Sequence, residues 1–337
     1  MGELLKGQVA IITGSGQGIG KELALWMARE GCRVITNNRK KGSSLQAHDG
    51  KVVKLDEDDI KKISAIVGDA ETAAAYVNAD AQVKEAGGEA YPVYSDVSTA
   101  EGCKKLVDTA LERWGRVDIL VINAAATWTG NFKDMSIQNW ETCVRSKLDQ
   151  AFYLMHYAVP DMKKRNYGRI IMAASEAHMG LEGMCGYSAA CGGVTAYAKA
   201  VAQDLVDDGI TVNAYTPNAG TRSWFNMLAE YREEGYDVEA IEEGSPNAQK
   251  FPPDRMIGFL GYMCLPEFTA TGLCVSVCAD GEAALWTNYT KYNTIFKDIW
   301  AEGPWTVEDI RAKMPELLHK VFYSKTKLAV TKSEYDT

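Results

Sequence analysis

The sequence predicts an α/β fold in which helices cover both faces of a parallel sheet. Three observations lead to this class. A short apolar run, VAIITG (9–14), ends in glycine. The glycine-rich turn SGQGIG follows it and leads into a segment whose apolar residues have helical spacing. Apolar runs and helical segments then alternate as far as residue 217, which is the order expected when helices connect parallel strands.

The first strand, turn and helix form the clearest unit. After the turn, apolar residues recur at the spacing of one helix face, at Leu23, Leu25, Trp26 and Ala28. RVITNN (33–38) follows as a second strand. The three segments together predict a βαβ opening of the kind that nucleotide-binding sheets use.

The same alternation continues through four more strands, each a short run of mainly apolar residues, as in strands buried on both faces. The predicted strands are AYPVYSDV (90–97), VDILVINAA (117–125), GRIIMAAS (168–175) and ITVNAYTP (210–217). The predicted helices cover residues near 73–86, 99–114, 136–163, and 187 to about 207.

Two segments fall outside this alternation. Residues 40–72 are polar and charged and separate the second strand from the next helix, which predicts a surface insertion. In the C-terminal part, Thr306 is followed three residues later by Asp309, which is the chemistry of a helix start. We therefore expect a main domain over 1–285 and a helical extension over 286–337 that packs on this domain or on a second subunit.

Composition limits the classes of partner and compartment. A formal net charge of -9 and a pI near 5.2 argue against nucleic acid or an anionic membrane as the main partner, which leaves small molecules. No signal-peptide run and no 18-residue apolar stretch occur, so we expect a cytoplasmic protein. The eight cysteines form no C-x-x-C pair and the four histidines are scattered, so we expect reduced thiols and no metal site.

The glycine turn has the properties of a phosphate-binding loop. Gly14, Gly18 and Gly20 allow the backbone to turn tightly and to approach a pyrophosphate. The N-terminus of the following helix offers unpaired N–H groups and a positive dipole to that anion. A glycine turn alone is a weak signal, and this one departs from the G-x-G-x-x-G spacing because Ile19 stands between the last two glycines.

Further motifs in the right order make the signal specific. Thr13-Gly14-x-x-x-Gly18-x-Gly20, Asp96, Asn123-Ala124-Ala125, Ser175 and Tyr187 together resemble the ordered signature of the short-chain dehydrogenase/reductase family. The resemblance covers roughly residues 6–282. It implies a Rossmann-type doubly wound, seven-stranded parallel sheet and a bound nicotinamide cofactor.

A narrower resemblance concerns one branch of this family. PNAGTR (217–222), the long segment after the second strand, GRIIMAAS and the tail near 305–328 are similar to the (R)-3-hydroxyacyl-CoA dehydrogenase part of peroxisomal multifunctional enzymes. This similarity suggests an acyl-CoA substrate.

The family resemblance also implies a set of cofactor contacts. Asp96 would face the adenine, Asn123 would lie along the cofactor, and Thr221 would meet the carboxamide. The whole set is Gly14, Ser15, Gln17, Gly18, Ile19, Gly20, Asn38, Arg39, Asp96, Val97, Asn123, Ala124, Pro217 and Thr221. A turn-forming role at the end of a strand is the alternative for Asp96.

The end of the second strand bears on the choice of cofactor. An acidic residue there would bind the adenosine ribose 2′-hydroxyl and repel a 2′-phosphate. The letters are instead Asn37, Asn38, Arg39, Lys40 and Lys41. This favours NADP(H) over NAD(H), with a solvated basic turn as the alternative.

The catalytic set implied by the family keeps two members and loses two. Ser175 and Tyr187 are present as orienting hydroxyl and general acid or base. Cys191 stands where the family has the lysine that binds the nicotinamide ribose and lowers the tyrosine pKa, and Lys147 stands where it has an asparagine. The compensation hypothesis is that Lys147 reaches across from the neighbouring helix and takes the lost role. The alternatives are an inactive site in which Lys147 points to solvent, and a reactive thiol at Cys191.

Further residues bear on the substrate, and the family resemblance bears on the oligomeric state. Trp224 and Phe225 lie in the segment that covers the substrate in this family, and they suit a bulky hydrophobic ligand such as an acyl-CoA or a hydroxysteroid, although helix packing also explains them. Glu176 and His178, just past Ser175, are further helpers, His178 as a proton donor or substrate contact. The family implies a homodimer or homotetramer. A silent subunit that pairs with an active paralogue is the second functional hypothesis.

Overall fold

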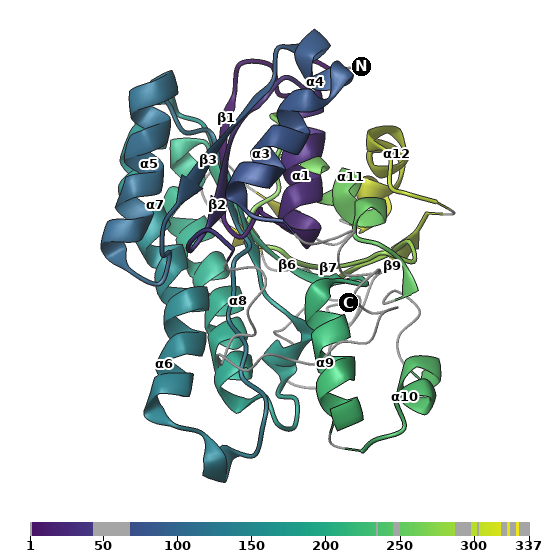
Figure 1. Ribbon diagram of the computed structural model, residues 1–337. Helices are drawn as coiled ribbons and strands as arrows, with labels where there is room; N and C mark the ends of the chain where they lie inside the picture. The colour runs from purple at the N-terminus through teal and green to yellow at the C-terminus, as the bar shows by residue number, and fades with distance from the viewer. Residues whose placement is uncertain are drawn as a thin grey trace.

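A nine-stranded sheet runs through the centre of the protein, and helices lie on both of its faces (Figure 1). The computed structural model describes residues 2–42, 68–233, 235–244, 250–286, 298–301, 303–317, 322–323 and 328–329. The strand order is β3-β2-β1-β4-β5-β6-β7-β8-β9. Strands β1 to β7 are parallel to one another, whereas β8 and β9 are antiparallel to their neighbours.

The strands are short and mostly buried. Their bounds are β1 (Val9–Ile12), β2 (Arg33–Asn38), β3 (Glu89–Tyr94), β4 (Ile119–Ile122), β5 (Gly168–Ala173), β6 (Ile210–Asn218), β7 (Cys274–Cys278), β8 (Glu282–Leu285) and β9 (Asp298–Trp300). A separate antiparallel pair is formed by β10 (Phe322–Tyr323) and β11 (Leu328–Ala329).

The helices connect the strands and follow the predicted order. Their bounds are α1 (Gly18–Arg29), α3 (Ala70–Ala79), α4 (Ala81–Ala86), α5 (Ala100–Trp114), α6 (Ile137–Val144), α7 (Gln150–Arg165), α8 (Cys185–Leu205), α9 (Arg222–Glu233), α10 (Val238–Gly244), α11 (Asp254–Tyr262) and α12 (Val307–Leu317). Short 3₁₀ turns are η2 (Phe132–Asp134), η4 (Glu176–Met179) and η5 (Val206–Asp208), and η3 (Arg145–Asp149) is a π-helical turn.

The predicted fold class is confirmed, and the sheet is larger than expected. Seven parallel strands form the body, and β8 and β9 extend it beyond β7. The chain reverses at Gly281, whose φ of +105° favours glycine, and the amide of Ala301 donates to the Gly281 carbonyl at 3.0 Å. The C-terminal extension was expected to be helical, but it contributes strand β9 as well as α12. Strand β9 joins the sheet with the side chain of Ile299 buried in the core.

Two predicted helices have interruptions in the structure. The helix expected over 136–163 is α6 and α7 joined by the π turn η3. The helix expected near 73–86 is two helices, because the Asp80 side chain accepts from the amides of Gln82 and Val83 and so starts a new helix. Most of the insertion predicted over 40–72 lies outside the described residues.

Two hydrophobic cores sandwich the sheet. One lies between the sheet and the face covered by α1 and α11, and the other lies on the face of α5, α7 and α8 (Figure 1). Strand β1 pairs with β2 on one side and with β4 on the other, so the connections diverge between β1 and β4. In open α/β sheets this switch point is where ligands bind, at the carboxyl ends of the strands.

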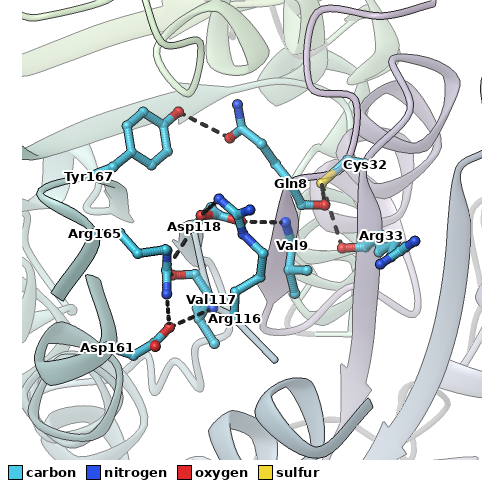
Figure 2. Close-up of polar contacts among 10 residues, drawn as sticks. All are labelled: Gln8, Val9, Cys32, Arg33, Arg116, Val117, Asp118, Asp161, Arg165 and Tyr167. Carbon is cyan, nitrogen blue, oxygen red and sulfur yellow. Dashed lines mark hydrogen bonds and ion pairs between the residues drawn. The ribbon is translucent and has the colours of Figure 1, made fainter. Parts of the chain in front are cut away.

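The opposite edge of the sheet is fastened by a buried carboxylate, which Figure 2 shows. Asp118 is fully buried and accepts from the amide of Val9 at 2.8 Å. It also pairs with Arg116 at 2.7 Å and with Arg165 at 3.4 Å. Because Val9 opens β1 and Asp118 directly precedes β4, these bonds lock the amino ends of the two central strands.

Candidate active site

The glycine turn is held rigidly between the first two strands. Gly14 and Gly18 have φ values of +64° and +52°, which favour glycine. At Gly20 a Cβ atom would lie 2.7 Å from the Gly14 carbonyl oxygen, so only glycine allows α1 to start so close to the turn. The hydroxyl of Ser15 donates to the Ile12 carbonyl at 2.7 Å and accepts from the Asn37 amide at 2.9 Å. These bonds fix the loop in a preformed shape.

Polar atoms without partners surround this turn. No side chain caps the N-terminus of α1 at Gln17, which leaves its first amides for a ligand. Gln17 Oε1 and Asn38 Oδ1 are buried, and neither has a hydrogen-bond partner within the described ranges. A methyl group of Thr221 lies 4.0 Å from the position of a Cβ on Gly18, so the loop after β6 reaches the turn. The arrangement fits a dinucleotide with its pyrophosphate at the turn.

The structure brings the predicted cofactor residues to one edge of the sheet. Asn38 ends β2 and the side chain of Arg39 is exposed beyond it, while Ile19 packs against the core on α1. Asp96 and Val97 follow β3, Asn123 and Ala124 follow β4, and Pro217 lies near the end of β6. These positions are the carboxyl ends of neighbouring parallel strands, as the family resemblance implied.

Two of these side chains also shape their own loops. Asp96 Oδ1 accepts from the amide of Ser98 at 3.0 Å and from its hydroxyl at 2.7 Å, which is the turn-forming role considered above. The Asn123 side-chain amide donates to the Thr13 carbonyl at 3.2 Å, and its Oδ1 accepts from the Tyr215 hydroxyl at 3.1 Å. Tyr215 could not be predicted as part of the site, because a tyrosine in an apolar strand gives no signal of a polar contact.

A π turn positions Lys147. Ser146 Oγ accepts from the Ala126 amide at 2.9 Å, and the Gln150 side chain donates to the Ala124 carbonyl at 2.5 Å. Both contacts tie η3 to the loop that follows β4. The extra residue of a π turn rotates the side chains relative to an α-helix. Lys147 points inward, with only 3% of its surface exposed.

Lys147 meets Tyr187 at the centre of the site. Its Nζ lies 3.5 Å from Tyr187 Oη, 3.4 Å from the Ala174 carbonyl oxygen and 5.2 Å from the centre of the tyrosine ring. Both polar contacts are long for hydrogen bonds. The Cys191 thiol and the Ser175 hydroxyl are close enough to the Tyr187 hydroxyl to influence its pKa. The structure therefore brings all four predicted catalytic residues together.

Burial dominates the acid–base chemistry of this cluster. Burial, followed by the influence of Cys191, raises the pKa of Tyr187 well above its usual value. Burial likewise raises the pKa of the Cys191 thiol and lowers the pKa of Lys147. The lowered tyrosine pKa that the family arrangement implies is therefore absent from the protein alone, because every one of these groups is driven toward its neutral form.

The residues just after Ser175 form the short 3₁₀ turn η4. Ser175 Oγ accepts from the Ala177 amide at 3.2 Å and starts η4. His178 Nδ1 lies 2.7 Å from the Ser175 carbonyl oxygen, and its ring packs edge-on against Trp286 at 4.8 Å. These contacts give His178 a role in holding the loop. Burial raises the pKa of the neighbouring Glu176 carboxyl.

The two predicted substrate aromatics differ in their surroundings. Trp224 is 9% exposed and packs with Leu228 and Val238, so its ring joins α9 to α10. Phe225 is only partly buried at the edge of the same cluster. Helix packing accounts for Trp224, and Phe225 is the member of the pair that keeps surface for a ligand.

Comparison with known proteins places the chain in a family. The family model for short chain dehydrogenases matches residues 8–78 and 52–224 in two overlapping segments. The chain therefore belongs to the short-chain dehydrogenase/reductase family, and its class is that of an oxidoreductase. Within the described part of the chain, no helix is long and apolar enough to cross a membrane.

Particular relatives agree with the predicted resemblance. A 3-oxoacyl-[acyl-carrier-protein] reductase from Synechocystis sp. is 30% identical over 77% of this chain and 90% of its own length. The peroxisomal multifunctional enzyme type 2 of Drosophila melanogaster is 33% identical over 66% of this chain, which spans 33% of that enzyme. The crystal structure of L-sorbose reductase from Gluconobacter frateurii, complexed with NADPH and L-sorbose, has a TM-score of 0.67 at 23% identity, over 83% of this chain and 98% of that one.

Proposed function

We propose that the protein transfers a hydride between NADP(H) and a bulky hydrophobic secondary alcohol or ketone, with Lys147 in place of the lysine lost at Cys191. The observation that carries this proposal is the 3.5 Å contact between Lys147 Nζ and Tyr187 Oη. Forty residues separate the two in the sequence, and they come from neighbouring helical segments. A degenerate site in which Lys147 points to solvent does not explain a lysine that is almost fully buried.

The acid–base surroundings favour ketone reduction. When bound, the nicotinamide would supply the hydride. Ser175 and Tyr187 would orient the carbonyl oxygen through their hydroxyls. Tyr187 is protonated at neutral pH and so can act as the proton donor to that oxygen, but its raised pKa makes it a weaker acid than an ordinary tyrosine, so the transfer depends on Lys147. The Lys147 ammonium would then stabilise the phenolate that remains.

The preference for NADP(H) rests on the end of β2. Arg39 and Lys40 are exposed there, where a 2′-phosphate would lie. The neighbouring carboxylate, Asp69, is engaged as the cap of α3, since its Oδ1 accepts from the Thr72 amide at 3.0 Å. We expect R39A to weaken NADPH binding about tenfold or more and to leave NADH binding within about twofold, as measured by fluorescence titration.

The proposed substrate class is supported by the apolar cluster of α9 and α10 and by the relatives. Phe225 on α9 offers apolar surface. The chain is also similar to peroxisomal multifunctional enzymes, and this similarity favours an acyl-CoA substrate. A hydroxysteroid is the other candidate. NADPH oxidation with acetoacetyl-CoA and with a steroid ketone tests both, and turnover of either that disappears in Y187F supports the proposal.

A catalytically silent subunit is the second candidate function. Two observations favour this second function. The polar contacts of Lys147 Nζ are long, at 3.4 and 3.5 Å, and the pKa of Tyr187 is raised, whereas an active general base would have a lowered pKa. It predicts no turnover in the screen and indifference to Y187F. It also predicts a complex with an active paralogue, whereas the enzyme proposal predicts a homodimer or homotetramer, which light scattering after size exclusion measures.

A further inference from the structure

A buried glutamine at the end of the π turn contacts three separate parts of the site. Gln150 is fully buried at the start of α7. Its Oε1 accepts from the Thr13 hydroxyl at 3.2 Å, and its Nε2 donates to the Ala124 carbonyl at 2.5 Å and to the Ser146 carbonyl. Thr13 directly precedes the glycine turn, Ala124 lies in the loop after β4, and Ser146 lies in η3. One side chain therefore joins the glycine turn and the loop after β4 to the turn that carries Lys147.

The hydrogen bonds of Thr13 fix the orientation of this side-chain amide. The Thr13 hydroxyl oxygen accepts from the backbone amide of Asn123 at 2.9 Å and from that of Ala124 at 3.0 Å. These two bonds use the lone pairs of the oxygen, so the hydroxyl proton remains to be donated. The atom of Gln150 that faces this proton must be the oxygen. The side-chain nitrogen is thereby directed at the two carbonyl groups, both of which need a donor.

The bond to Ser146 replaces one that the π turn removes. In an α-helix the Ser146 carbonyl would accept from the backbone amide four residues later, which is that of Gln150. In η3 the backbone amide that closes the turn donates to the Arg145 carbonyl instead. The side-chain Nε2 of Gln150 donates to the Ser146 carbonyl in its place. The glutamine therefore stabilises the π turn, because it satisfies a carbonyl that the turn leaves out of the helical pattern.

The position of the π turn decides where Lys147 points. Lys147 lies between Ser146 and Gln150 in the sequence, and its Nζ lies 3.5 Å from Tyr187 Oη. If the extra residue of the turn moved along the helix, each side chain that it passed would rotate by about 100° around the helix axis, the angle of one residue. A rotation of that size would take the ammonium group away from Tyr187.

We propose that Gln150 is a positioning residue, which holds Lys147 against Tyr187 and ties its position to the glycine turn. This inference rests on the proposed function, in which Lys147 acts on Tyr187 and on the bound cofactor. Gln150 acts through the backbone of η3. Loss of its side-chain bonds should release Lys147 and leave the glycine turn in place, since Thr13 keeps its bonds to the loop after β4.

A labelling measurement tests the position of Lys147 without any cofactor. The wild type, Q150M, Q150E and Q203A are methylated with formaldehyde and sodium cyanoborohydride, and the rate at each lysine is measured by mass spectrometry of peptides. Q150M keeps the length of the side chain without its polar atoms, and Q150E keeps the acceptor for Thr13. Gln203 is the matched control, because its Nε2 also donates to a carbonyl four residues earlier, that of Lys199 on α8 at 3.2 Å.

We expect Lys147 to react about tenfold faster or more in Q150M than in the wild type, with an intermediate rate in Q150E and an unchanged rate in Q203A. The buried Lys199 reports general loosening of the fold and should stay within about twofold in every variant. An unchanged rate at Lys147 in Q150M, or an equal rise at Lys147 and Lys199, would overturn the assignment. If Q150M does not fold, the same criteria apply to Q150E.

A double-mutant cycle tests whether Gln150 affects the cofactor through Lys147. NADPH is titrated by fluorescence into the wild type, Q150M, K147M and Q150M/K147M. We expect Q150M to weaken NADPH binding about fivefold or more in the wild-type background and less than about twofold in the K147M background, where the lysine is already gone. Equal losses in both backgrounds would contradict the positioning role. A K147M variant that binds NADPH as tightly as the wild type would instead count against the proposed function, and the labelling rates would then decide the role of Gln150.

Discussion

At the scale of single residues, the candidate site depends on a lysine whose burial is unfavourable for its charge. The side chain of Lys147 is nearly fully buried, and no carboxylate pairs with it among the described residues. Burying an unpaired ammonium costs free energy, which the lowered pKa of Lys147 reflects. A residue that destabilises the fold and contacts Tyr187 is typical of a functional site.

This cost leads to a prediction about stability. K147M should raise the free energy of unfolding by about 1–2 kcal/mol at pH 7, because methionine fills the space without a charge. The folded wild type binds fewer protons than the unfolded chain between the lowered pKa and the usual lysine value. The advantage of K147M should therefore shrink as the pH rises toward that usual value. Urea denaturation at pH 7 and pH 9.5 measures it, and a K147M protein less stable than wild type would contradict the account.

The sequence could identify the candidate catalytic residues but not their arrangement. Ser175, Tyr187, Lys147 and Cys191 were all found from the ordered motifs. Whether Lys147 points inward depends on the rotation of its helix, which the π turn sets. A π turn has no compositional signal in the letters RSKLD, so two orientations stayed open. The sequence also could not predict that burial shifts the pKa values of this cluster toward the neutral forms, because burial depends on how the chain packs.

At the scale of elements, the glycine turn was the most predictable part. Its glycines are required by backbone conformation and close approach, and both constraints act on residues near one another in the sequence. The strands β8 and β9 were less predictable. Strand β8 is only four residues long, and its pairing with β9 joins segments on both sides of a region outside the described residues. Such long-range pairing leaves little local pattern.

The turn gives a prediction at this scale. G20A would place a Cβ 2.7 Å from the Gly14 carbonyl oxygen and 2.8 Å from Ser15 Cα, both in rigid backbone. We expect NADPH binding to weaken at least tenfold and the free energy of unfolding to fall by about 1–3 kcal/mol. Gly192 lies inside α8, and a Cβ added there would lie 3.8 Å from its nearest neighbour, the His178 carbonyl oxygen. Because alanine favours a helix more than glycine does, the control G192A should be about 0.5–1 kcal/mol more stable than the wild type. Unchanged NADPH binding in G20A would show that the turn is not the cofactor cradle.

At the scale of the whole molecule, the candidate site and the Asp118 network lie at opposite ends of the parallel strands. The carboxyl ends of the strands hold the candidate site, while the amino ends are fastened by the network around Asp118 (Figure 2). Parallel α/β sheets place ligands at the carboxyl edge, so the amino edge is available for structural bonds. Changes at the two edges should therefore have separable effects.

A variant of the amino edge tests this separation. D118A leaves the Val9 amide and Arg116 without their acceptor, whereas Arg165 keeps its bonds to Asp161 and to the Val117 carbonyl. We expect the free energy of unfolding to fall by about 1–3 kcal/mol, because the buried Val9 amide loses its acceptor and the partly exposed Arg116 loses its partner. The Kd for NADPH, measured below the unfolding transition, should stay within about twofold. A large change in that Kd without a loss of stability would contradict the separation.

We propose that Lys147 supplies the ammonium group that the family places at the position of Cys191. The most direct measurement is a fluorescence titration with NADPH of the wild type, K147M and the double variant K147N/C191K, which restores the family arrangement. We predict that K147M binds NADPH at least tenfold more weakly and that the double variant returns to within about threefold of the wild type. Equal affinity of K147M and the wild type would contradict the claim.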